Sequence, residues 1–272
     1  MTRPAAALAG IAVGALLAGC GGPSAGEVLQ QTTSNLPKIK SAHVRLRLVL
    51  EPRDAARGGR VGFALDGPLQ IRPGGLPVAQ VGYTQIAGKR QAQATFLSTG
   101  TEAFVEVAGT PYRLSKRQTR ALTQSAGSVR GGANVPLGRW LQDPKVADGE
   151  KLDGTSTDHL SAKLDVATAL RDIFRTAAAA GAAVPDLSGA RADELRNAIT
   201  SSSVDAWSGQ GDHYLRRLRL AIGFRVTPPR GLRQKLGDLV GGRLAFDVDL
   251  TRINAPVHVQ APAHPKPPVR LR

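Results

Sequence analysis

The sequence has only one cysteine, Cys20, in 272 residues. A chain with one cysteine cannot form an internal disulfide, so the thiol is free, paired with another chain, or modified. Catalytic patterns are lacking as well. No Gly-x-Ser-x-Gly motif follows a strand, and the five histidines show no metal-binding spacing such as His-x-x-x-His. The segment 156–159, Ser-Thr-Asp-His, places its neighbouring side chains on opposite faces of a strand. We therefore predict a protein without enzymatic activity, cofactor or metal, and keep an enzyme of unrecognised type as a minor alternative.

Long apolar runs are also lacking. The longest, Ala5 to Leu17, is shorter than the roughly 20 residues that cross a bilayer, and it is rich in alanine and glycine. It follows the short basic segment 1–4, which gives the layout of a signal peptide. We predict that residues 1–19 are removed on export.

The run ends in Leu-Ala-Gly-Cys at 17–20, which resembles the lipobox of bacterial lipoproteins. That resemblance implies a diacylglyceryl group on Cys20, cleavage before it, and palmitate-like acyl chains as anchor. Two chains hold a protein stably on a membrane, whereas one gives marginal binding. The predicted location is the extracytoplasmic face of the cell membrane. The alternative is that Cys20 is a small apolar residue in an ordinary signal.

Aromatic residues make up only 4% of the chain, and acidic residues are outnumbered, 21 against 36 basic ones. A formal net charge of +15 would suit a nucleic-acid partner. Export and the scarcity of aromatic stacking platforms argue against that partner. The basic residues are either solvated surface or attract anionic lipid headgroups or wall polymers.

After a lipidated tether at 20–23, the pattern predicts one domain over 24–260 and a Pro-rich basic tail over 261–272. Ser24 and Glu27 form a capping box for a helix that runs to about Asn35. Alternating apolar residues then predict strands joined by tight turns, a meander of hairpins. These strands are 41–50, 60–70, 79–86, 91–98, 102–107 and 112–114.

The second half begins with helical patterns at 115–124 and near Trp140, separated by a Gly-rich loop at 127–134. Strands are expected at 146–152 and 156–164, helices at 165–181 and 190–200, and strands at 204–207, 213–224 and 243–253. About ten strands and four helices in this order predict an α+β fold with a large curved antiparallel sheet.

Four segments together resemble the LppX/LprG family of actinobacterial lipoproteins. They are 39–43 (Ile-Lys-Ser-Ala-His), the hairpin 149–160, the strand end 204–207 (Val-Asp-Ala-Trp), and 254–257 (Asn-Ala-Pro-Val). The resemblance covers nearly the whole chain after the signal peptide. The chain differs from the family in its Arg-rich strands and in its Gly-rich loop near 131–132.

The resemblance implies a U-shaped half barrel, a fold shared with periplasmic lipoprotein carriers, with helices across the concave face. It also implies an apolar cavity that holds acyl chains of a lipid or glycolipid, which the protein carries or presents in the cell envelope. Candidate cavity residues are Val44, Leu46, Leu48, Val81, Tyr83 and Phe96. The alternatives are that these residues are ordinary core, and that the protein is an envelope scaffold that binds anionic wall polymer or a partner protein.

Overall fold

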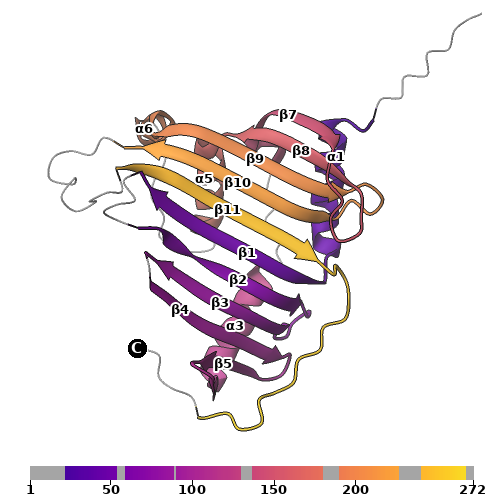
Figure 1. Cartoon of the computed structure of the whole chain (residues 1–272), viewed down its shortest axis with the longest axis vertical. Coiled ribbons are helices and arrows are strands. Elements are labelled where there is room, and N and C mark those ends of the chain that lie inside the picture. The colour runs from indigo at the N-terminus through magenta and orange to yellow at the C-terminus, as the bar shows by residue number, and fades with distance from the viewer. Residues whose placement is uncertain are drawn as a thin grey trace, which may run out of the picture.

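A single antiparallel sheet of eleven strands dominates the computed structural model, which describes residues 22–53, 59–88, 90–129, 137–179, 190–226 and 240–267 (Figure 1). The first six strands are β1 (Ser41–Pro52), β2 (Val61–Gln70), β3 (Val78–Ala87), β4 (Arg90–Thr99), β5 (Ala103–Val107) and β6 (Thr110–Arg113). The other five are β7 (Leu141–Asp148), β8 (Thr157–Leu164), β9 (Ile199–Gly209), β10 (Leu215–Arg225) and β11 (Gly241–Thr251).

Two meanders make up this sheet, and the first and last strands join them. The strand order is β6-β5-β4-β3-β2-β1-β11-β10-β9-β8-β7, so β1 pairs with β2 on one side and with β11 on the other. Leu46 of β1 lies opposite Leu65 of β2 and Val248 of β11. The sheet is open, with β6 and β7 as its edges, and it curves without closing into a barrel. The predicted α+β half-barrel architecture is confirmed.

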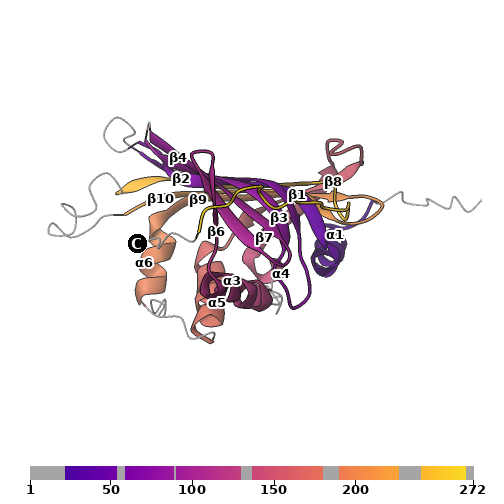
Figure 2. The same ribbon diagram turned by 90° about the horizontal axis from the view of Figure 1, so that it is seen from below.

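All the helices of the described residues lie on one side of the sheet, as Figure 2 shows. They are α1 (Ala25–Asn35), a short 3-10 turn η1 (Leu36–Lys38), α3 (Lys116–Val129), α4 (Leu137–Trp140), α5 (Val166–Ala179) and α6 (Ala190–Ala198). The opposite side carries no helix among these residues. The sheet therefore has a helix-side face and a bare face.

Helix α1 begins with the predicted capping box. The hydroxyl of Ser24 accepts a hydrogen bond from the backbone N–H of Glu27, whose carboxylate accepts one from the backbone N–H of Ser24. These bonds satisfy N–H groups that have no partner within the helix. Gly22 to Gly26 also has the spacing Gly-x-Ser-x-Gly, contrary to the expectation that the chain lacks this motif. Its serine is this N-cap, so it serves the helix.

A closed core lies where α4 and α5 cover the β8–β10 half of the sheet. Its buried members are Trp140, Leu164, Val166, Ala169 and Val204. Leu218, Leu220 and Ile222 of β10 pack against this cluster and are half-buried. Leu218 therefore points to the helix-side face, and so does every residue of the sheet that has the same orientation as Leu218.

Several boundaries differ from the sequence pattern. The strand expected at 146–152 is β7, which begins at Leu141 and ends at Asp148, because Leu152 turns back to bridge Thr155. The helix expected at 190–200 ends at Ala198, where β9 begins. The sheet has eleven strands and the described residues contain five α-helices. Each of them corresponds to a segment expected from the sequence, although the expected totals were about ten and four. Most of the predicted Gly-rich loop lies outside the described residues.

The chain after β11 is extended, and its end pairs with β6. Lys266 accepts a hydrogen bond from the backbone N–H of Arg113 at 2.9 Å and donates its own N–H to Pro111 at 2.9 Å. This segment thereby runs from the middle of the sheet to its β6 edge (Figure 1). It carries part of the predicted tail, whose last five residues lie outside the described residues.

Candidate functional site

The six candidate cavity residues share one face of the sheet. Leu46 lies opposite Leu65, and Leu65 lies opposite Tyr83. Phe96 lies opposite Val81 in the next strand pair. Directly opposed residues of antiparallel strands point to the same side, and residues two apart in one strand do so as well. Val44 and Leu48 are each two residues from Leu46 in β1, so they point to the same side as Leu46.

This shared face is the helix-side face. Leu46 lies opposite Val248 of β11, which in turn lies opposite Leu218 of β10. Leu218 packs against the core beneath α5. The six residues thus belong to the face that helices cover, although they stand on the half built from β1 to β4.

Burial separates the two halves of this face. Trp140 at the β7–β10 end is 8% exposed, while Tyr83 at the other end is 38% exposed. The other five candidates are half-buried. The Tyr83 ring stacks on Phe63 of β2 with 6.1 Å between ring centroids, and Phe63 is also half-buried. We call the following set the apolar half-face: Val44, Leu46, Leu48, Phe63, Leu65, Val81, Tyr83 and Phe96.

The eight side chains of the apolar half-face are uncharged, and Arg90 at the start of β4 is the one charged residue of β1 to β4 and β11 that points to the same side. Every residue of β1, β2, β3 and β11 that points to this side is uncharged, and all but a few are aliphatic or aromatic. Contiguous apolar surface that stays partly accessible is uncommon on soluble proteins and marks binding sites. An arrangement of this kind can shelter hydrocarbon, and it offers no nucleophile or acid–base pair.

Sequence reasoning missed Phe63, Leu65 and the inward residues of β11. The signal was present, because Leu244, Phe246 and Val248 alternate with neighbours that point to the other face. What the sequence did not reveal is the pairing of β1 with β11, which extends the surface from Leu46 to Val248.

The bare face has the opposite chemistry. Arg45 and His43 both contact the carboxylate of Asp66, at 3.1 and 2.7 Å. Burial raises the pKa of Asp66, but hydrogen bonds from His43 and Arg45 outweigh it, so the pKa lies below its ordinary value. Farther along, His159 contacts Asp205 at 2.9 Å and stacks on Trp207 with 4.4 Å between ring centroids. The side chains of Asp158 and His159 go to different partners, since Asp158 accepts a hydrogen bond from Gln210.

Cys20 lies outside the described residues, so its lipidation stays a prediction. No helix among the residues described is long and apolar enough to cross a membrane. The same residues contain no group of three or more histidine, aspartate or glutamate side chains that could hold a metal ion.

No protein-family model matches this chain, and no curated protein sequence matches it. Among solved structures, LprF from Mycobacterium bovis is similar, with 16% identity, coverage of 90% of this chain and 100% of that one, and a TM-score of 0.46. The Mycobacterium tuberculosis lipoprotein LppX is 16% identical over 86% of this chain and 96% of its own, with a TM-score of 0.42. A LolA superfamily protein from Nitrosomonas europaea is 11% identical over 88% of this chain and 99% of its own, with a TM-score of 0.24. LppX gives its name to the family that the sequence resembles. At these scores and identities, the ligand must be inferred from this chain's own residues.

Proposed function

We propose that this protein is a membrane-anchored extracytoplasmic lipoprotein that binds the acyl chains of a lipid or glycolipid and carries or presents it in the cell envelope. The observation that supports this function is the apolar half-face, a charge-free surface on the helix side whose members remain half-exposed. Burial of hydrocarbon there gains about 0.8 kcal/mol per CH₂ group, so an acyl chain of ordinary length supplies ample binding energy.

The position of the surface suits an elongated apolar ligand. The half-face crosses the paired strands β4, β3, β2 and β1 in register, and β11 continues it toward the core beneath α5. A chain laid across neighbouring strands meets apolar side chains at each one. The helices on this side supply the second wall that a ligand pocket needs (Figure 2).

The membrane anchor in this proposal is the lipid on Cys20. Only a few residues separate Cys20 from Ser24, where α1 is capped, and an extended chain spans at most about 3.6 Å per residue. The folded domain would therefore stay close to the membrane surface, within reach of the lipids it would load or deliver.

Native and denaturing mass spectra of the chain from Gly21 to Arg272 test this function. This chain keeps every described residue and omits the anchor, so any bound lipid is held by the fold. After expression in a bacterium and purification without detergent, we expect a native mass above the polypeptide mass. The extra mass should leave on denaturation and fragment into acyl chains.

A native mass equal to that of the bare polypeptide, with no uptake of added phospholipid or glycolipid, would contradict lipid binding. The residues of the apolar half-face would then be part of an ordinary hydrophobic core that the helices cover only partly. The remaining candidate would be the scaffold function, in which the basic surface binds a wall polymer or a partner protein.

A further inference from the structure

The bare face carries arginines and carboxylates on its central strands, and most of these are paired. Arg217 contacts Asp249 at 2.5 Å and also pairs with Glu150. Weaker pairs are Arg60 with Glu51 at 3.8 Å and Arg219 with Asp247 at 3.9 Å. Arg45 shares Asp66 with His43.

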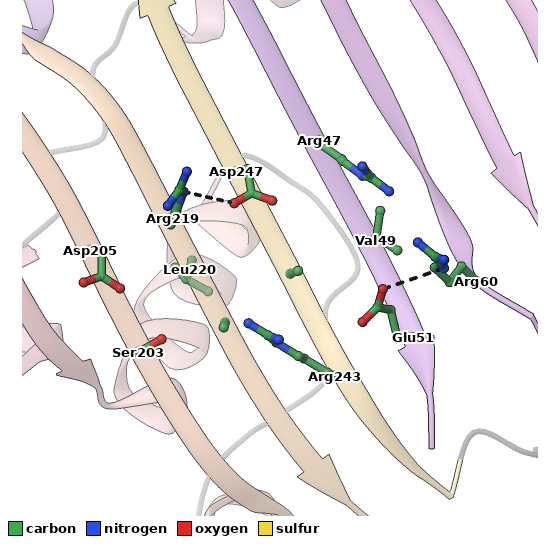
Figure 3. A pocket seen from close by; sticks show the side chains of 12 residues that line it. Arg47, Val49, Glu51, Arg60, Ser203, Asp205, Arg219, Leu220, Arg243 and Asp247 are labelled. Atoms are coloured by element: carbon green, nitrogen blue, oxygen red, sulfur yellow. Dashed lines mark ion pairs between the residues drawn. The ribbon is translucent and has the colours of Figure 1, made fainter. Parts of the chain in front are cut away.

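Two adjoining depressions of about 360 and 310 Å³ share Glu51 and Arg243 (Figure 3 shows the larger). The larger lies on this face. The smaller lies where β1 and β10 end and β11 begins, and Pro52 and Phe224 of the helix side line it as well. Small apolar residues of the strands, Val49, Ala221 and Ala245, lie among the charged side chains that line the larger one. Together the two depressions are lined by six arginines and three carboxylates. The arginines are Arg47, Arg53, Arg60, Arg219, Arg225 and Arg243.

Four of these six arginines have no anionic partner among the residues that the structure describes. Within the described ranges, the side chains of Arg47, Arg53, Arg225 and Arg243 form no ion pair and no hydrogen bond, and all four are exposed. Every other arginine that projects from the bare face of β1, β2, β10 or β11 contacts a carboxylate. Among the described residues of β1, β2, β10 and β11, the unpaired arginines of this face are thus gathered around the two depressions, while Lys145 of β7 and Lys163 of β8 are further unpaired cations of the same face.

We propose that the bare face docks on a membrane that contains anionic phospholipids, with Arg47, Arg225 and Arg243 on lipid phosphates. Guanidinium groups bind phosphate through paired N–H donors, and cations near an anionic bilayer attract it additively. The depressions combine a cationic rim with small apolar residues, and that combination matches the phosphate and glycerol region of a lipid better than a wholly hydrophilic polymer. This inference goes beyond the proposed function because it concerns the opposite face of the sheet.

Vesicle flotation with the chain from Gly21 to Arg272 tests the docking without the anchor. The triple variant R47Q/R225Q/R243Q is compared with K116Q/R117Q/R120Q, which removes the same charge from exposed positions of α3 on the helix side. Wild type should bind vesicles of phosphatidylcholine with added phosphatidylglycerol, and bind less as salt rises. Each arginine contributes about fivefold in affinity, so the first variant should lose about a hundredfold. The α3 variant should lose far less.

Equal losses in both variants would overturn the proposal, because net charge alone would then explain binding. Undiminished binding to pure phosphatidylcholine vesicles would overturn it too. Tighter arginine-dependent binding to inorganic phosphate, or to a soluble anionic wall polymer, than to vesicles would assign the site to that ligand instead. Lipid retained in the native mass spectrum should be unchanged in R47Q/R225Q/R243Q, so the two functions fail independently.

Discussion

The hydroxyl oxygens of Thr32 and Ser208 lie 2.7 Å apart in a buried hydrogen bond that joins α1 to β9 across 176 positions of sequence. Asn35 adds a second link by donating its side-chain amide to the carbonyl of Asp212 at 3.0 Å. Val28, one turn before Thr32, is buried against the same end of the sheet. These contacts fix the N-terminal helix to the second meander.

Thr32→Val should lower the free energy of unfolding by about 1–3 kcal/mol, because it leaves the buried Ser208 hydroxyl without this partner. Chemical denaturation measures the change, and Ser34→Ala at an exposed position of the same helix is the control. The double variant T32V/S208A should recover much of the loss, since both polar groups are then gone. A double variant less stable than T32V would contradict this account of the contact.

His159→Ala should uncover the Trp207 ring, which is 7% exposed and lies beneath the imidazole and the guanidinium groups of Arg217 and Arg219. Loss of the stack should cost about 1 kcal/mol beyond the lost burial. Iodide quenching of tryptophan fluorescence should increase, because iodide can then reach the ring of Trp207. Trp140 is buried and contributes little to the quenching in either protein. His264→Ala, at an exposed position of the extended tail, should leave quenching unchanged. Equal quenching in wild type and H159A would argue against the stack.

The buried carboxylate of Asp172 should make stability depend on pH. The indole of Trp140 donates to it at 3.0 Å, and this bond holds the pKa of Asp172 below its ordinary value against the effect of burial. A lowered folded-state pKa stabilises the protein above the unfolded-state pKa of about 3.9, and the contribution is lost as pH falls through the folded-state value.

Asp172→Asn should therefore be less stable than wild type near neutral pH, and the difference should shrink on acidification below about pH 4. Urea denaturation at several pH values measures it. The control is Asp193→Asn, whose exposed pair with Arg196 should contribute little at any pH. A difference between wild type and D172N that stays constant with pH would exclude a charged Asp172.

Cys20→Ser should abolish lipid attachment. Expressed with its first 19 residues in a bacterium that processes lipoproteins, the natural chain should incorporate a labelled palmitate analogue and partition into detergent. The variant should incorporate none and should retain the segment before residue 20. Equal labelling of the two proteins would contradict the lipobox interpretation.

Local pattern was enough to predict most elements of this fold. The alternation of Val44, Leu46 and Leu48 with polar neighbours indicated β1, and Ser24 with Glu27 indicated the start of α1. Both signals arise within one turn or a few residues, where the backbone geometry alone sets the period. The helix expected at 190–200 was placed two residues too far, and the strand expected from 204 begins five residues earlier, at Ile199.

Long-range pairing and degree of exposure were not predictable. The contact of β1 with β11 joins residues about 200 positions apart, and no local pattern encodes it. Alternation with Leu48 and Leu50 places Val49 on the bare face, yet it is 3% exposed and lies among the charged side chains that line the larger depression. Whether Leu46 fills a core or lines a lipid site also depends on what the helices leave uncovered, which alternation does not record.

The lipid content of Leu46→Trp, compared with that of Arg45→Trp on the opposite face of the same strand, shows whether the apolar half-face binds acyl chains. An indole at position 46 projects from the apolar half-face and should displace acyl chain, whereas one at 45 projects from the bare face. We predict much less bound lipid in L46W by native mass spectrometry, unchanged lipid in R45W, and stability of L46W within about 1 kcal/mol of wild type, since an open site tolerates the ring. Full lipid occupancy in L46W would contradict lipid binding at this surface. So would a loss of stability of about 1–3 kcal/mol in L46W, typical of an overpacked core, together with no lipid bound to either variant.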